Sequence, residues 1–262
     1  MSLKSVLRGI APLAALALAA AASGGCDKMH VSLNGEEGKK LSELDLTGTP
    51  PSKVALLGPD TVRIAAGDTL AISIDGDLDV AEQIRFTLND GTLGILRNNG
   101  KGSSDETVTV NVTMPAPKKL MLAGSGKIVS PGLASDSARV SVAGSGTVET
   151  DSVATDSLKV DIAGSGSYRA AGSAKSLKVS IAGSGDARLD ALKVDDAKID
   201  IAGSGDTAFA SDGTVKANIM GSGEVRVIGR ATCKVTAMGS GRLVCEPAAS
   251  AGAKPKGDRP KA

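Results

Sequence analysis

Seven basic side chains recur in this sequence at one fixed distance from the tripeptide Gly-Ser-Gly. Each lies five residues before the first glycine of a copy, and the set is Lys119, Arg139, Lys159, Lys178, Lys198, Lys216 and Lys234. The residues around them alternate between apolar and polar, so on a strand the cations face away from the apolar side chains. Stacked in a row, they have two interpretations. They are either a linear site for an anionic polymer, such as an acidic polysaccharide, lipopolysaccharide or teichoic acid, or a solvated face that prevents strand aggregation.

Other reactive residue types lie at or just after the same tripeptides. The repeated serines lack the Gly-x-Ser-x-Gly setting of a nucleophile elbow, and the single histidine, His30, lies far from the repeats. Asp186, Asp206 and Glu224 follow three successive tripeptides and could stack around a cation. Calcium-binding β-rolls, however, repeat a motif of about nine residues, roughly half the interval seen here. We therefore expect a solvated acidic face, no metal site and no cofactor.

Two cysteines fall in the last repeat. Cys233 lies six residues before Gly239, and Cys245 lies six residues after it, both at inward positions. In an oxidising compartment the two thiols could form a disulfide that locks the end of the domain. The alternative is two small buried side chains on different sides of a corner, too far apart to bond. Zinc is not expected, because no third cysteine or histidine lies near them.

The composition excludes some classes of partner. The 262 residues carry 30 Lys and Arg against 29 Asp and Glu, a formal charge of +1. This balance lacks the basic signature of a nucleic-acid-binding chain. The three aromatic residues, Phe86, Tyr168 and Phe209, are too few to form a platform for stacking bases. We expect no nucleic-acid partner. The 33 glycines indicate many turns and little helix.

The elements that position the cations repeat with the tripeptides. Apolar residues occupy the second and fourth positions before each copy, and no helical period is sustained. This pattern predicts an all-β fold, a parallel β-solenoid whose coils of 18–20 residues stack to bury a shared core. The first glycine of each copy is expected at a corner that needs positive φ and leaves no room for a side chain. These corners are Gly124, Gly144, Gly164, Gly183, Gly203, Gly221 and Gly239.

The sequence outside the repeats divides into segments of different composition. Residues 1–25 are typical of a secretory signal peptide, with basic residues before a short apolar run. Cys26 follows small residues, as the lipidated cysteine of a bacterial lipoprotein does; the alternative is ordinary cleavage nearby, which leaves a chance thiol. The remaining predictions are a polar tether over 26–52, a solenoid domain over 53–246 (irregular first coils over 53–118, Gly-Ser-Gly repeats over 119–246) and a disordered tail over 247–262.

Three features of the sequence together resemble one family. They are the signal peptide, the irregular strands, and Met114-Pro115 leading to Leu120-Met121-Leu122-Ala123-Gly124-Ser125-Gly126 and its six further repeats. It is the putative autotransporter adhesin head GIN domain family of bacterial envelope proteins. The resemblance covers about Val54 to Glu246. It implies a right-handed β-helix shaped like the pectin lyases, without their catalytic residues.

We therefore expect a non-enzymatic protein of the bacterial cell envelope, periplasmic or on the outer surface. Its expected partners are a membrane, held through a lipid on Cys26, and an anionic polysaccharide or an envelope protein bound by the solenoid. The alternative is an enzyme that acts on acidic polysaccharide, as pectin-lyase-type β-helices do. The strictly repeated surface and the scarcity of aromatic residues argue against a single active cleft.

Overall fold

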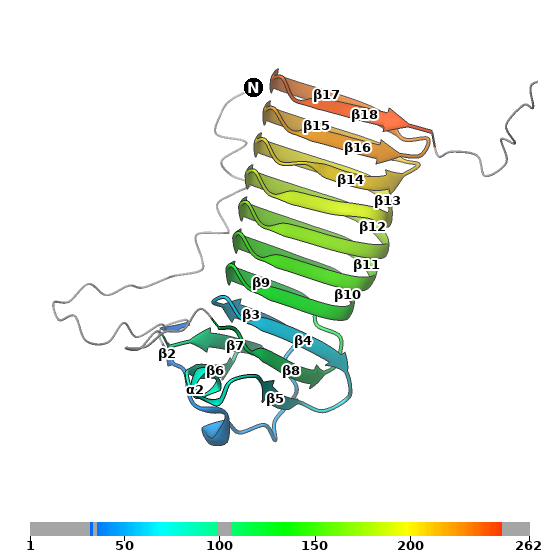
Figure 1. The fold of residues 1–262 in the computed structure, drawn as a ribbon. Coiled ribbons are helices and arrows are strands. Elements are labelled where there is room, and N and C mark those ends of the chain that lie inside the picture. Colours follow the sequence, from blue (N-terminus) through cyan, green and yellow to red (C-terminus); the bar gives the residue numbers. More distant parts are fainter. Residues whose placement is uncertain (1–31, 34–35, 99–105, 248–262) are drawn as a thin grey trace, which may run out of the picture.

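The computed structural model describes residues 32–33, 36–98 and 106–247. Over the repeats the chain winds into coils that stack as the layers seen in Figure 1. Neighbouring coils pair in parallel and in constant register, so that Val140 pairs with Val160 and Val160 with Val179. The predicted all-β parallel β-solenoid, with coils of about 20 residues, is confirmed.

The repeat region consists of strands β9 to β18. In the middle coils one long strand bends around almost the whole coil, whereas in the later coils a turn divides it into two strands. The bounds are β9 (Lys119–Gly124), β10 (Lys127–Gly144), β11 (Thr147–Gly164), β12 (Ser167–Gly183), β13 (Asp186–Gly203), β14 (Thr207–Ser211), β15 (Thr214–Gly221), β16 (Glu224–Ile228), β17 (Thr232–Gly239) and β18 (Arg242–Glu246).

The inward side chains form one continuous core along the stack. Alternation along each strand places residues such as Val140, Val160 and Val179 inside, where they are fully buried. Tyr168 and Phe209 fill the interior of the middle coils and are also fully buried. A single coil covers only one side of such residues, so each coil depends on its neighbours for burial.

The Gly-Ser-Gly copies form the corners of successive coils. Gly164 has φ +110°, in the region that favours glycine, and a Cβ there would lie 2.5 Å from the carbonyl oxygen of Gly144. The same carbonyl accepts a hydrogen bond of 2.9 Å from the Ser165 N–H. The corner therefore combines left-handed backbone with direct stacking of backbone on backbone, and the serines between the glycines are exposed.

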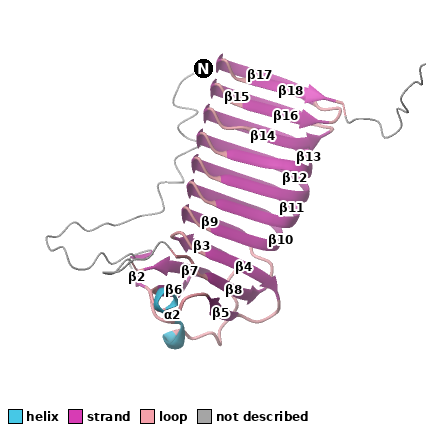
Figure 2. Ribbon diagram, in the orientation of Figure 1, coloured by secondary structure: helices cyan, strands magenta, loops and turns pink. Residues whose placement is uncertain are grey.

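An irregular cap closes the end of the stack that comes first in the chain. Figure 2 shows that the described helical segments lie only in this region. The elements are β1 (Ser32–Leu33), β2 (Glu36–Glu37), the 3-10 helix η2 (Leu41–Glu43), β3 (Lys53–Leu57), β4 (Thr61–Ala66), β5 (Ala71–Asp75), α2 (Leu78–Ala81), β6 (Ile84–Asn89), β7 (Thr92–Arg97) and β8 (Thr109–Met114).

The coils of the cap do not stack in chain order. β3 pairs in parallel with both β7 and β9, so the first coil of the chain lies between the second coil and the repeats. β4 likewise lies between β8 and β10. β5 and β6 add antiparallel to β8 and β7, and they cover the outer edge of the cap. This end of the parallel sheet is therefore not left with an open parallel edge.

Part of the predicted tether is in contact with the cap. Lys39 and Phe86 exchange two backbone hydrogen bonds of 2.8 Å, and Leu41, Leu44 and Leu46 pack against the core. The predicted signal peptide, Cys26 and the tail after Pro247 lie outside the described residues. Within the described ranges, no helix has the length and apolar character needed to cross a bilayer.

The opposite end of the stack has no such cover among the described residues. β17 and β18 form the last coil, and each pairs with a strand on one side only. Val235, at an inward position of this coil, is 50% exposed. The two ends of the solenoid therefore differ: one is closed by antiparallel strands, and the other presents its edge and part of its core.

Candidate functional site

The seven cations predicted from the tripeptide spacing lie in register on one face. Lys119 pairs with Arg139, and the pairing continues from coil to coil through Lys159, Lys178, Lys198, Lys216 and Lys234. Lys53 of β3 pairs with Lys119 and adds one more cation to the column. We call these eight residues the basic ladder. Neighbours in it are separated by the strand spacing of about 4.8 Å.

Sequence reasoning missed Lys53 because β3 is not followed by a Gly-Ser-Gly copy. A signal was present, since Lys53 precedes Val54 and Leu56 as Lys119 precedes Leu120 and Leu122. Only the pairing of β3 with β9 reveals that these two segments share a register. The ladder therefore extends beyond the repeats into the cap.

The columns beside the ladder consist mostly of small side chains. Two residues after the ladder cation, the middle coils have Ser141, Asp161, Ser180, Asp200 and Asn218. Four residues after the cation, nearer the corner, the side chains are Ala123, Ala143, Ala163, Ala182 and Ala202. Because these side chains are short, the surface between the cations and the corners projects little from the backbone. Ser141, Asp161 and Ser180 are buried, so the alanine column is the accessible surface between the cations and the corners.

Few carboxylates offset the charge of the ladder. Asp161 is fully buried and is shared by Arg139, at 2.7 Å, and Lys159, at 3.6 Å. Lys198 lies 3.5 Å from Asp200. Five lysines of the ladder make no ion pair within the described part of the chain: Lys53, Lys119, Lys178, Lys216 and Lys234.

The pKa of Lys119 reflects its surroundings. Burial of the ammonium group, followed by repulsion from Arg139 and from Lys53, lowers this pKa below its ordinary value of 10.5. Asp161 acts in the opposite direction but is the smallest of these effects. An anion bound over this part of the ladder would relieve the repulsion.

The three acidic residues after successive corners have structural partners. The Asp206 N–H donates to Oδ1 of Asp186 at 3.4 Å, and the Glu224 N–H donates to Oδ1 of Asp206 at 2.8 Å. Glu224 also pairs with Arg242 of the last coil. The described residues contain no group of three or more histidine, cysteine or acidic side chains that could hold a metal ion. These carboxylates tie one coil to the next.

Cys233 and Cys245 form a disulfide in the last coil. Their sulfur atoms are 1.94 Å apart, and the Cα atoms are 6.8 Å apart. The bond joins β17 to β18 across the inside of the coil. It therefore closes the coil that has a neighbour on one side only.

The sequence was compared with protein families and with curated proteins. The sequence model of a family described as "putative auto-transporter adhesin, head GIN domain" matches residues 50–231. No curated protein matches the chain.

Three solved structures of bacterial proteins have a similar fold. A putative adhesin from Bacteroides fragilis has a TM-score of 0.67 at 18% identity, covering 76% of this chain and 92% of that one. A putative lipid binding protein from Parabacteroides distasonis gives 0.59 at 21% identity, covering 75% and 93%. A putative adhesin from Parabacteroides merdae gives 0.56 at 18% identity, covering 76% and 92%. At these identities the likeness concerns the fold.

Proposed function

The chain belongs to the putative auto-transporter adhesin, head GIN domain family, and on that premise we propose that it is a non-enzymatic binding protein of the bacterial envelope. Its ligand is an anionic envelope polymer that runs along the solenoid axis and follows the basic ladder. The names given to the solved relatives, adhesin and lipid binding protein, are consistent with a binding role.

The observation that carries the proposal is the uncompensated charge of one column. Eight cations lie in register, and two carboxylates, Asp161 and Asp200, offset them. Like charges directly opposite each other on neighbouring strands destabilise a sheet, so the fold bears a cost along this face. A polymer with evenly spaced anionic groups removes that cost and gains one contact from each coil.

The solubility interpretation of the ladder explains less of this arrangement. Charged side chains protect a sheet when they lie on an open edge, where another chain could pair with the backbone. Apart from Lys234 on the last coil, the ladder instead lies on strands that are already paired on both sides. Charges of either sign, or an alternation of signs, would keep such a face in solution, but here every member is positive.

The test is binding of the protein to envelope polymers at low and high salt. In the ladder variant, three lysines without ion pairs, Lys178, Lys216 and Lys234, are changed to Gln. In the control variant, three cations of other faces, Lys40, Lys175 and Lys193, are changed to Gln, which alters the net charge equally. We expect the ladder variant to lose about tenfold or more in affinity, and the control to lose about twofold or less. Binding should weaken at high salt, because exposed charges are screened.

Three results would overturn the proposal. Equal losses in the two variants would mean that the ladder is no more than part of the net charge. Shortening of a polymer during the incubation would support the alternative of a polysaccharide-acting enzyme. Binding of a protein partner that is unaffected by the ladder variant would move the search to another face.

The second part of the proposal concerns location. We propose that the signal peptide is removed and that Cys26 carries a lipid, which anchors the protein to a membrane of the envelope. Labelling cells with a fatty-acid analogue should mark the protein, and Cys26→Ala should abolish both the label and the membrane association. Recovery of the unsubstituted protein without lipid would contradict this part alone and would leave the ladder proposal intact.

A further inference from the structure

A hollow interrupts a different face of the solenoid, where one coil is a residue shorter than its neighbours. β12 has 17 residues, whereas β11 and β13 have 18. The pairing passes from Thr150–Ala170 to Val153–Gly172, so two residues of β11 are opposed by one of β12. The pairing of β12 with β13 shifts at the same bend. Gly172, at φ +115°, permits the shorter path, because a Cβ there would lie 2.2 Å from the Val153 carbonyl oxygen.

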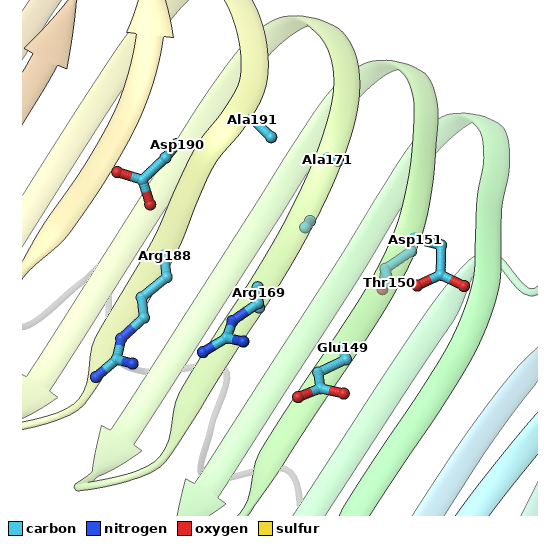
Figure 3. Close-up of a pocket in the computed structure, with 9 residues that line it drawn as sticks. Glu149, Thr150, Asp151, Arg169, Ala171, Arg188, Asp190 and Ala191 are labelled. Atoms are coloured by element: carbon cyan, nitrogen blue, oxygen red, sulfur yellow. The ribbon is translucent and has the colours of Figure 1, made fainter.

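The short coil leaves a hollow of about 450 Å³ with a floor of small side chains. The floor consists of Ala170, Ala171 and Ala191. Figure 3 shows Glu149, Arg169 and Arg188 in a row along one side, on three neighbouring coils. Asp151 and Asp190 lie along the other side. The hollow is therefore bordered by two guanidinium groups and three carboxylates.

Arg169 is a cation without a partner within the described residues. It lies in register between Glu149 and Arg188. Glu149 is held by Lys127, 2.8 Å away, and Arg188 is held by Asp186, 3.1 Å away. Each neighbour of Arg169 thus has its own ion-pair partner: Lys127 on the preceding coil for Glu149, and Asp186 on the same strand for Arg188. Two guanidinium groups remain next to each other, and only one of them is neutralised.

We propose that this hollow binds a single sugar residue that carries a carboxylate, a hexuronate. The planar forks of Arg169 and Arg188 match a carboxylate, which can accept two parallel hydrogen bonds from a guanidinium group. Asp151 and Asp190, as acceptors, suit the hydroxyl groups of the same sugar. The side chains of the floor are methyl groups only, which lets the sugar ring approach the backbone.

This inference deepens the proposed function, since it names the class of polymer that would carry the anionic groups. The two sites are separate, because the hollow involves the strand segments after the corners and the ladder involves those before them. One site can therefore fail while the other stands. The hollow takes one residue, so its affinity should depend little on polymer length, whereas ladder binding should increase with length.

The experiment measures binding of glucuronate and of short glucuronate oligomers to the full chain by calorimetry. Two probes lack one part of the ligand: methyl glucoside has the hydroxyls without the charge, and acetate has the carboxylate without the hydroxyls. We expect saturable binding of glucuronate alone among these three small molecules. Equal binding of methyl glucoside or acetate would overturn the assignment, because the site would then recognise only half of the sugar acid.

Three variants test the location. Arg169→Gln removes the unpaired cation, and Ala171→Gln fills the floor; each should weaken glucuronate binding by about tenfold or more. Arg226→Gln is the matched control, since Arg226 lies in the same column outside the hollow and is 3.8 Å from Glu246. It should change the affinity by about twofold or less. Equal weakening by Arg169→Gln and Arg226→Gln would overturn the site.

The ladder variant of Lys178, Lys216 and Lys234 separates the two proposals. It should bind the glucuronate monosaccharide as the unsubstituted protein does, while its affinity for the polymer falls by about tenfold or more. Thermal unfolding of every variant checks that the coil is intact. An absence of saturable glucuronate binding in a protein with normal unfolding would refute the hollow as a hexuronate site and leave the ladder untouched.

Discussion

Arg97 and Asp60 form a buried ion pair that joins the two coils of the cap. Their side chains are 3% and 1% exposed. Nε of Arg97 donates to Oδ2 of Asp60 at 3.0 Å, and Oδ1 of Asp60 also accepts the Val108 N–H at 3.0 Å. Asp60 precedes β4, Arg97 ends β7, and Val108 precedes β8. The pair therefore lies where the out-of-order coils meet.

Removing one member of this pair should destabilise the protein strongly. Asp60→Asn leaves the Arg97 guanidinium buried beside a neutral amide, and the loss of a buried partner costs about 3 kcal/mol. Urea denaturation would show it as a lower midpoint. The control is Glu82→Gln, which breaks the exposed pair between Lys40 and Glu82, and it should leave the midpoint nearly unchanged. Similar midpoints for the two variants would mean that the cap does not depend on the buried pair.

A methyl group at one corner should disturb the stack. In Gly164→Ala the new Cβ meets the Gly144 carbonyl, and the backbone is held at φ +110°. The left-handed strain alone costs about 1–3 kcal/mol, so we expect a clearly lower unfolding temperature. Gly48→Ala is a suitable control, because nothing lies within 4 Å of its new Cβ. An unchanged unfolding temperature for Gly164→Ala would show that the corners relax easily.

The sequence predicts the repeat region well for a physical reason. Each coil has the same spacing between cation, apolar residues and glycine, so stacking any two coils in register aligns the whole set. The cap lacks this repeated spacing, and the alternation of apolar and polar residues alone does not predict which strand pairs with which. The position of β3 between β7 and β9 therefore could not be inferred, and neither could the place of Lys53 in the ladder.

The hollow was visible in the sequence only as a shorter spacing. Gly164 and Gly183 are 19 residues apart, which shows that a residue is missing from that coil but not where. Gly172 marks the place once the register is known, because it faces the Val153 carbonyl. Arg169 and Arg188, which border the hollow, lie in a column that also holds Arg63, Val129, Glu149, Ala208 and Arg226. No regular pattern singles them out.

Breaking the disulfide should loosen only the open end of the solenoid. Cys233 and Cys245 are 12 residues apart, and closing a loop of that size contributes about 3 kcal/mol in the chain-entropy model. Because each coil contacts only its neighbours, changing both cysteines to Ser should affect β17 and β18 most. Hydrogen exchange should become faster in these strands, with β10 to β12 unchanged. Uniformly faster exchange would indicate that the last coil supports the whole stack.

Removing the charge of Lys119 from the basic ladder should increase the stability of the protein and weaken its binding of the polymer. Lys119→Met keeps most of the apolar stem and removes the charge that faces Arg139 and Lys53. Relief of like-charge repulsion between strands should raise the unfolding free energy by about 0.5 kcal/mol. The same variant should bind the anionic polymer more weakly than the unsubstituted protein. A residue with a purely structural role would not move stability and binding in opposite directions.

The pH dependence of unfolding provides an independent check on Lys119. Its pKa is lowered in the folded protein, so between that pKa and the ordinary 10.5 the unfolded chain binds more protons than the folded one. The contribution of Lys119 to stability therefore rises with pH across this window and is level on either side of it. Other groups titrate here as well, so the measurement is the difference between the unsubstituted protein and Lys119→Met in thermal unfolding. The stability advantage of the variant should shrink as the pH rises toward 10.5. A constant advantage at every pH would mean that burial of the stem, and not the charge, sets the stability effect at this position.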